Sequence, residues 1–274
     1  MAEPQKFTNL RRPNRIWAIG AVHAQPDQLY AMHEAVASAF RPGDRLVYLG
    51  NMIGRGERVI ETMDALLAFR TWLLGMPGLV ASDIVHLRGA QEEIWQKLLQ
   101  LHFAPDPVQV LDWMLQQGAA ATLAAYGGSA EQGMAAARGG AVTLSRWTQG
   151  LRQAVQAHPG HDALYSSLRR AAYTGLPEAR DGVDPGLLLV SAGIDTTRPL
   201  GRQGDSFWWG AAGFSRIGAP YGGFQRIVRG FDPEQKGVRI DDFTATLDGG
   251  CGFGGHLVCG CLSASGEMLD LFQV

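Results

Sequence analysis

The sequence predicts an α/β protein in which parallel strands alternate with helices. Apolar, strand-like segments occur at residues 15–20 (RIWAIG), 45–50 (RLVYLG) and 83–89 (DIVHLRG), and each is followed by a segment whose apolar residues recur at helical spacing. Each strand-like segment ends in a glycine before its loop: Gly20, Gly50 and Gly89. This alternation favours parallel strands with helices packed on them.

Helices are expected at residues 26–40, at residues 57–70 and from Glu92 onward. In the first of them the apolar side chains that define the helical spacing are Leu29, Met32, Val36 and Phe40. Glu92 and Glu93 open the third helix, where the helix dipole favours acidic side chains.

The second half of the chain predicts an insertion followed by more strands. Residues 103–178 are Ala-rich and helical in pattern, which indicates a helical cap. The segment at 186–195 (GLLLVSAGID) resumes a buried strand, and the short strands after it suggest a second, more antiparallel sheet. No repeat or long linker divides the chain, so we expect a single domain over residues 15–274 and a flexible N-terminal arm over residues 1–14.

Composition and charge narrow the class of protein. The chain has 274 residues, a formal net charge of -2 and 46% hydrophobic residues, which fits a soluble protein with a sizeable core. Its apolar runs are too short to span a membrane, its N-terminal segment lacks the apolar core of a secretory signal, and it has no basic run of the kind that binds nucleic acid. We therefore expect a cytoplasmic protein whose cysteines are reduced packing residues: Cys251, Cys259 and Cys261.

Six segments at the predicted strand ends point together to one family. They are AIGAVHAQPDQL, VYLGNMIGRGE, VHLRGAQEE, LLVSAGID, RIVRGFDP and TLDGGCGFGGHLV. In this order they resemble the loops of calcineurin-like metallophosphoesterases, in particular the bacterial serine/threonine phosphatase and dinucleotide-tetraphosphatase branch. The resemblance covers nearly the whole chain, and QGDSFWWGAAGF is similar to the family's Trp-Ile-Arg segment. It implies an αββα sandwich of two mixed sheets with a helical cap insertion.

The resemblance also implies two metal ions, held at these loops by Asp, Asn and His side chains, that clamp a phosphate and activate a water. This chain departs from that pattern at most of the ligand positions. His23 keeps the family's residue type, whereas the other ligand positions are Ala21, Asn51, Ala90, Ser191 and Phe231. One neutral imidazole does not supply the ligands that two divalent ions need. The sequence therefore predicts no metal centre.

The family's acid–base and phosphate-holding positions are changed as well. The leaving-group acid is Gln91, the Asp that orients it is Gly54, and the Arg of the Trp-Ile-Arg segment is Gly210. These changes agree with one another, because carboxylates that face each other without a metal are costly to bury. We expect Phe231 to fill part of the vacated cavity. The sequence thus predicts a pseudoenzyme without a cofactor, acting as a structural, regulatory or binding subunit through protein contacts.

Two alternatives stay open. One is an active phosphatase with displaced ligands, for which Asp195 and Asp232 are the nearest carboxylates, although each also fits a loop or turn. The other is a metal-independent sensor that binds phosphate or a nucleotide through Arg55, with Arg88 assisting, since a guanidinium matches a phosphate without metal. A structural role is the competing interpretation for both arginines. An open cleft with Arg55 pointing inward favours the sensor, and a cleft closed by Phe231 favours the scaffold.

A surface for protein partners is expected at the segments SFWWGAAGF and APYGGF. Aromatic anchors are enriched at interfaces, and these segments carry Phe207, Trp208, Trp209, Phe214, Tyr221 and Phe224. The competing interpretation places most of these rings in the core beneath the second sheet.

Overall fold

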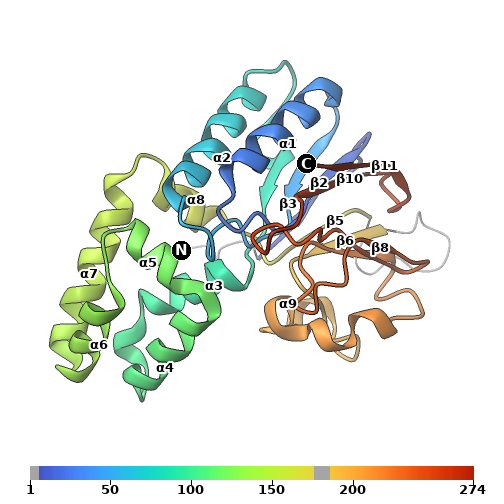
Figure 1. The fold of residues 1–274 in the computed structure, drawn as a ribbon. Helices are drawn as coiled ribbons and strands as arrows, with labels where there is room; N and C mark the ends of the chain where they lie inside the picture. The colour runs from blue at the N-terminus through green and yellow to red at the C-terminus, as the bar shows by residue number, and fades with distance from the viewer. Residues whose placement is uncertain (1–5, 176–185) are drawn as a thin grey trace.

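A computed structural model describes residues 6–175 and 186–274 of the chain. Two β-sheets lie at its centre and helices cover them on the outside (Figure 1). The five-stranded sheet has the order β11-β10-β2-β3-β4. Its strands are β2 (Ile16–Ile19), β3 (Arg45–Tyr48), β4 (Ile84–His86), β10 (Val258–Leu262) and β11 (Met268–Gln273). As the alternation predicts, β2, β3 and β4 are parallel.

The six-stranded sheet has the order β1-β5-β6-β7-β9-β8. Its strands are β1 (Phe7–Asn9), β5 (Ala171–Tyr173), β6 (Gly186–Val190), β7 (Phe224–Arg229), β8 (Arg239–Ile240) and β9 (Thr244–Thr246). Both sheets are mixed, as expected. The C-terminal strands do not form an antiparallel sheet of their own, because β10 pairs with β2 while β7 pairs with β6.

The core between the sheets follows from the two-residue period of the strands. Ile16 and Ala18 of β2 pack there with Leu187 and Leu189 of β6. Trp17, on the opposite face of β2, packs against the helices. Apolar residues thus occupy both faces of these strands, which is why the strands read as continuous apolar runs.

The helices that follow the parallel strands lie where the sequence predicts them. They are α1 (Pro26–Ala39), α2 (Val59–Leu74) and α3 (Ala90–Leu98). The outer face of the six-stranded sheet is covered by α9 (Ser206–Trp209) and the 3-10 helix Gly210–Arg216. Further 3-10 turns occur at Ala81–Asp83, Leu101–Phe103 and Leu200–Arg202. No helix within the described ranges is both long and apolar enough to cross a membrane.

The helical cap lies to one side of the sheets (Figure 1). It consists of α4 (Pro107–Met114), a π-helical turn (Leu115–Ala119), α5 (Ala120–Ala125), α6 (Ala130–Arg138), α7 (Ala141–Ala157) and α8 (His161–Ser167). The expected range of 103–178 is too long at its C-terminal end, because residues 171–173 form β5 and return the chain to the sheet. The last residues of that range lie outside the described part of the chain.

The N-terminal arm expected over residues 1–14 needs a correction. Residues 7–9 form β1, which pairs in parallel with β5. Leu10 is 1% exposed and packs between the sheets. An edge strand with an anchoring apolar side chain therefore replaces the expected arm from residue 7, while residues 1–5 lie outside the described residues.

Candidate functional site

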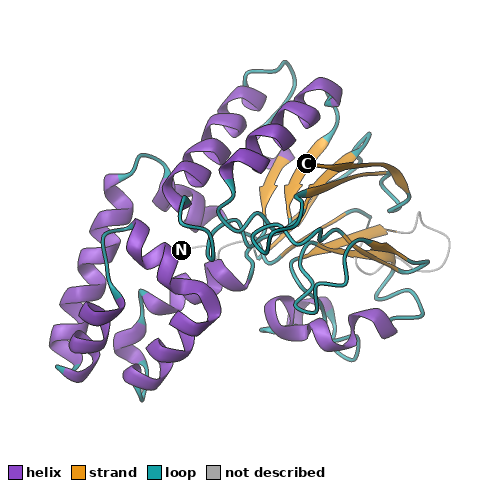
Figure 2. Ribbon diagram, in the orientation of Figure 1, coloured by secondary structure: helices purple, strands orange, loops and turns teal. Residues whose placement is uncertain are grey.

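The loops after β2, β3 and β4 meet at one end of the five-stranded sheet, since the carboxyl ends of parallel strands share an edge. These loops gather at the centre of the molecule, between the strands and the cap (Figure 2). The backbone N–H groups of Val22 and His23 both donate to the carbonyl of Asn51, at 3.0 and 2.8 Å. Beside them lies a cleft of about 230 Å³, whose lining includes Asn51, Arg55, Gln91, Trp209, Phe231 and Phe253.

Glu92 holds the second and third loops together. Its carboxylate accepts hydrogen bonds from the backbone N–H groups of Gly89, Asn51, Met52 and Ile53, at 2.7 to 3.2 Å. Burial raises the pKa of Glu92, although the four donors act in the opposite direction. The helix dipole, which the sequence suggested as the reason for an acidic residue here, is thus only part of its role. The buried side chain of Glu92 also connects the two loops through their backbone N–H groups.

Asn51 continues this connection. Its side-chain Oδ1 accepts from the backbone N–H of Gln91 at 3.0 Å, and its Nδ2 is buried without a hydrogen-bond partner among the described residues. Asn51 has φ of 53°, in the left-handed region that asparagine tolerates better than most residues. The amide oxygen of Asn51 therefore stabilises the loop, while its N–H₂ group is left without a hydrogen bond beside the cleft.

Gln91 closes the cleft on the cap side. Its Nε2 donates to the carbonyl of Gln117, in the π-helical turn, at 2.8 Å. The backbone N–H of Arg55 lies 3.4 Å from the carbonyl of Gly118 in the same turn. The cap is thus joined to the second and third loops by neutral hydrogen bonds.

His23 lies in an aromatic enclosure. Its ring makes edge contacts with Phe231 at 5.4 Å and Phe253 at 5.5 Å between centroids. The side chain is 1% exposed, and neither ring nitrogen has a hydrogen-bond partner among the described residues. Burial, reinforced by the charge of Arg55, lowers the pKa of His23 to about 3. The imidazole is therefore neutral and shielded from solvent at physiological pH.

A known structure shares this architecture. The structure of a "putative diadenosine tetraphosphatase" aligns with a TM-score of 0.55 and 16% identity, over 98% of this chain and 97% of that chain. The chain has the metallophosphoesterase fold. A protein serine/threonine phosphatase from Saccharomyces cerevisiae with similarity to human phosphatase PP5 aligns with a TM-score of 0.49 and 12% identity, over 98% and 83% of the two chains. No protein-family model and no curated protein matches the sequence. At such identities the likeness extends to the fold alone.

The donor set at the metal positions of the metallophosphoesterase fold does not fit a pair of metal ions. Within residues 6–175 and 186–274, no group of three or more His, Cys, Asp or Glu side chains is placed to hold a metal. Ala21 and Ala90 are buried and offer no donor, and the Oγ of Ser191 is buried without a partner in the same ranges. One enclosed imidazole with alanine, amide and hydroxyl neighbours lacks the ligand number and charge that such a centre requires.

The carboxylates considered as displaced ligands are engaged elsewhere. Asp232 forms a buried ion pair with Arg229 at 3.0 Å, and its backbone N–H donates to Asp248 at 2.7 Å. Asp195 accepts from both the backbone N–H and the hydroxyl of Thr197. Both residues thus have the structural roles of loop and turn carboxylates.

Arg55 and Arg88 are separated by the fold. Arg55 lines the cleft, with its guanidinium 4.3 Å from the centroid of the Phe253 ring. Arg88 pairs with Glu93 at 3.2 Å and lines a different cavity, so the fold does not bring it to Arg55, and the competing structural interpretation fits it better. Phe231 and the exposed Arg55 both line the cleft, so the cleft has one feature expected of a scaffold and one expected of a sensor.

The aromatic segments are mostly core, which corrects the predicted interface. Phe207, Trp208, Phe214, Tyr221 and Phe224 are each no more than 8% exposed and pack on the outer face of the six-stranded sheet. Rings buried in this way cannot contact a partner. Gly210, in the same segment, approaches Gly193 so closely that a side chain on Gly193 would meet its carbonyl at 2.4 Å.

Trp209 is the exception in that segment. It is 43% exposed, lines the cleft and packs edge-on against Trp113 of α4, with 5.8 Å between ring centroids. Trp113 is itself 42% exposed. The contact of Trp209 with Trp113 could not be predicted from the sequence, since only the fold brings the cap beside α9. Phe253 and Gln117 were missed for the same reason, although the glycines around Phe253 indicated a loop.

Proposed function

We propose that this chain is a catalytically inactive protein with a metallophosphoesterase fold, acting as a structural, regulatory or binding subunit through protein contacts. The observation that carries the proposal is the enclosure of His23 between Phe231 and Phe253. Histidine is a residue type that can bind a metal ion, but the ring of His23 faces two phenyl rings in this enclosure. Metal-dependent hydrolysis needs anionic or imidazole donors at that place.

The loops also hold their shape through contacts that need no metal. Glu92 supplies the negative charge for four backbone donors, and Asn51 and Gln91 join the loops and the cap through neutral amides. In a metal-dependent site the metal ions hold the loops together. Removing the charged side chains that bind those ions would remove this connection. Here the replacements form a self-consistent set, which supports a retained scaffold.

The Trp113–Trp209 pair is the surface we propose for a protein partner. Two partly exposed indoles in contact, one of which lines the cleft, have the character of interface anchors. The pair joins the cap to the segment after β6, so a partner bound there would contact both parts of the molecule. The cytoplasm remains the compartment we propose.

Phosphatase assays test the inactive part of the proposal. We expect p-nitrophenyl phosphate turnover in excess manganese to stay at the buffer rate, and to be the same in wild type and His23→Ala. A manganese-dependent rate that His23→Ala abolishes would contradict the proposal and would show that the chain is an enzyme with a different ligand set.

A second candidate, the anion sensor, is favoured by two unused donors beside the cleft. Arg55 has no carboxylate within ion-pair distance among the described residues, and Asn51 Nδ2 is unpartnered there as well. Binding of inorganic phosphate that is lost in Arg55→Gln and kept in Arg58→Gln would support this candidate. Arg58 is the matched control because it lies in the same loop and is paired with Glu61 and Asp27.

A further inference from the structure

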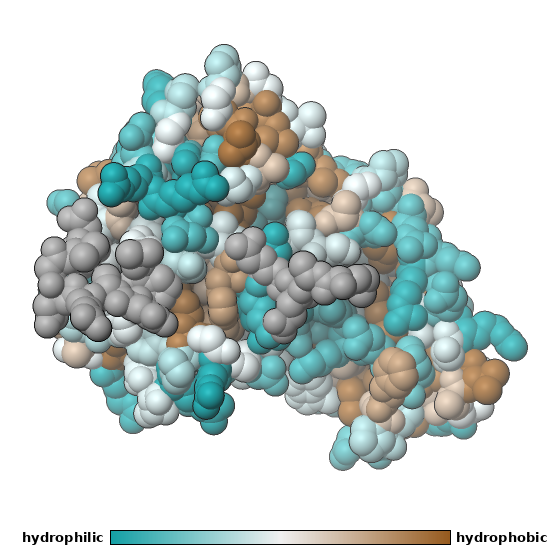
Figure 3. Space-filling view, turned by 180° about the vertical axis from the view of Figure 1, so that it is seen from behind, coloured by the Kyte–Doolittle hydropathy of each residue, from teal (hydrophilic) through white to brown (hydrophobic). Residues whose placement is uncertain are grey.

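A larger cavity, of about 560 Å³, lies between the cap and the edges of the sheets, apart from the cleft. We call it the cap–sheet pocket. Its basic lining residues are Lys6, Arg88, Arg152, Arg169 and Arg170. The acidic residues in its lining are Glu92 and Asp162. Hydrophilic residues cover much of the side of the molecule seen from behind, where the cap joins the body (Figure 3).

Backbone pairing brings most of these cations together. The N–H of Arg170 donates to the carbonyl of Lys6 at 2.8 Å, and the N–H of Arg88 donates to the carbonyl of Arg169 at 2.7 Å. Three separate segments thus place basic side chains on neighbouring backbone positions.

The charged side chains at the pocket differ in their partners. The carboxylate of Glu92 is occupied by backbone donors, and Glu93 pairs with Arg88. Arg152 and Arg170 have no carboxylate within ion-pair distance in the described part of the chain. Arg152 donates to the carbonyl of Leu99 at 2.6 Å, and Arg170 lies over the ring of Trp208 at 5.3 Å. Both guanidinium groups retain further N–H donors.

Besides Gln96, Gln100, Gln156 and Ser166, the remaining wall has an apolar and aromatic part. It includes Trp95, Leu99, Val155 and Leu168. The indole Nε1 of Trp95 is buried and has no hydrogen-bond partner among the described residues. A pocket of this size, with an apolar wall and convergent polar groups, has the character of a small-molecule site.

We propose that the cap–sheet pocket binds a small organic phosphate, with its phosphate on Arg152 and Arg170 and its apolar part against Trp95 and Leu168. Guanidinium groups match phosphate oxygens in pairs, and a divalent phosphate would balance the two guanidinium charges of Arg152 and Arg170. Arg152 belongs to the cap and Arg170 to the segment before β5. The ligand would therefore join the cap to the sheets, independently of whether the cleft is active.

Calorimetric titration of the full chain tests this proposal, with adenosine monophosphate as the organic phosphate and inorganic phosphate and adenosine as the comparison ligands. We expect one adenosine monophosphate per chain, bound more tightly than either comparison ligand. Arg152→Gln and Arg170→Gln should each weaken binding about tenfold or more, because each removes a charge-assisted contact. Arg146→Gln is the matched control, since Arg146 lies on α7 with Arg152 and is exposed.

The cleft is distinguished from the pocket by Arg55→Gln, which should leave this binding unchanged. No binding of adenosine monophosphate, or binding that Arg55→Gln abolishes while Arg152→Gln and Arg170→Gln retain it, would overturn the proposal. If inorganic phosphate bound as tightly as adenosine monophosphate, the proposed contact of the ligand's apolar part with Trp95 and Leu168 would be overturned. Thermal unfolding of each variant shows whether a loss of binding is only a loss of folding.

Discussion

The side chain of Gln91 occupies the space that any side chain at residue 54 would need. A Cβ built on Gly54 lies 2.1 Å from Oε1 of Gln91, and Gly54 has φ of +80°. The two positions to which the resemblance assigns the leaving-group acid and the residue that orients it are therefore linked in this chain by exclusion. The amide at 91 requires the glycine at 54, and it then reaches Gln117 in the cap.

Gly54→Ala should lower the free energy of unfolding more than a glycine substitution that is strained in the backbone alone. Gly78→Ala is the matched control, because Gly78 has φ of +83° and nothing within 4 Å of its Cβ position. We expect the control to cost about 1 to 2 kcal/mol, the usual penalty for the left-handed region. Urea unfolding should show a larger loss for Gly54→Ala, and that excess should disappear in a Gln91→Ala background. An equal loss in both glycine variants would contradict the exclusion.

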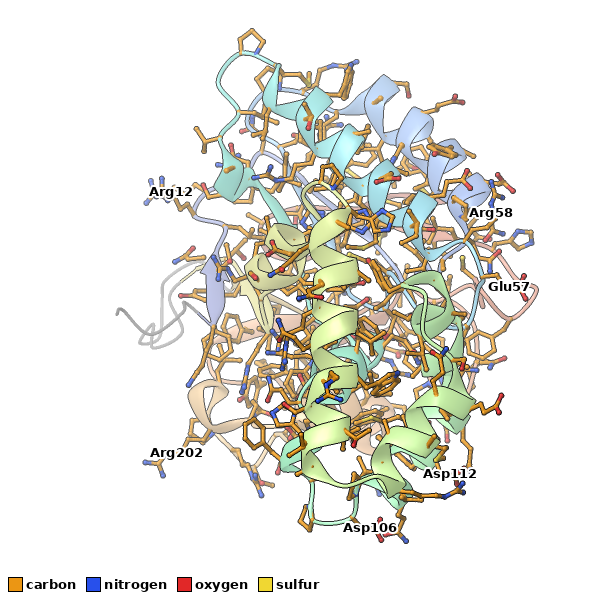
Figure 4. The ribbon with its side chains drawn as sticks, turned by 90° about the vertical axis from the view of Figure 1, so that its left-hand side faces the viewer. Arg12, Glu57, Arg58, Asp106, Asp112 and Arg202 are labelled. Carbon is orange, nitrogen blue, oxygen red and sulfur yellow. The ribbon has the colours of Figure 1, made fainter. Side chains whose placement is uncertain are left out.

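Glu92→Gln should destabilise the chain strongly. The amide would present an N–H₂ group to backbone donors that now face a carboxylate, leaving some of them unpaired, at a cost of about 1 to 3 kcal/mol each. Glu57→Gln is the control, since Glu57 is exposed and points outward (Figure 4). Chemical denaturation measures both variants. If Glu92→Gln were as stable as Glu57→Gln, Glu92 would not hold the loops.

Phe231→Ala should raise the pKa of His23 from about 3 toward the ordinary histidine value. Burial is the main cause of the low pKa, and Phe231 forms one side of the enclosure. NMR titration of the His23 ring protons measures the change. Phe103→Ala is the control, because Phe103 is 79% exposed and lies in the 3-10 turn Leu101–Phe103. A His23 pKa that stays near 3 in Phe231→Ala would show that the ring does not shield it.

Stability should fall as the pH drops below about 6.5. Burial lowers the pKa values of His23, His33 and His86 to about 3, so the unfolded chain takes up protons at these sites before the folded chain does. Each such histidine contributes stability above pH 6.5 that is lost as the pH falls toward 3, by about 1.4 kcal/mol per pH unit.

His86→Phe isolates one of these contributions. His86 stacks on Tyr48 at 4.7 Å, which a phenyl ring can also do, and its Nε2 has no partner among the described residues. Unfolding free energies at pH 7.5, 6.5 and 5.5 should fall less steeply in this variant than in wild type. An unchanged slope would mean that His86 does not remain neutral in the folded state.

Much of the fold could be predicted from the sequence because its signals are local. Apolar strands ending in glycine and helical spacing after each of them located β2, β3, β4 and their helices. The two-sheet architecture came instead from the resemblance of the six loop segments, in their order, to those of the metallophosphoesterases. The strand β1 was missed because three residues in a polar segment carry little periodic signal, and their pairing with β5 is a long-range contact.

The residue types at the candidate site could be predicted from the sequence, but the contacts between them could not. The sequence shows which donors are absent, but the enclosure of His23 needs Phe253, a residue far along the chain. The aromatic segment illustrates the same limit, since its composition fits either a core or an interface. Only the packing against the six-stranded sheet separates Trp208, which is buried, from Trp209, which is exposed.

The most direct test of the proposed inactive scaffold is the metal content of the chain. Elemental analysis of protein purified without added metal, repeated after incubation with excess manganese and removal of the unbound ion, measures the stoichiometry. We predict far less than one metal ion per chain in both samples, because the loops offer His23 without supporting ligands. Two metal ions per chain would contradict the account and would identify the cleft as a metal centre with a donor set other than the one described.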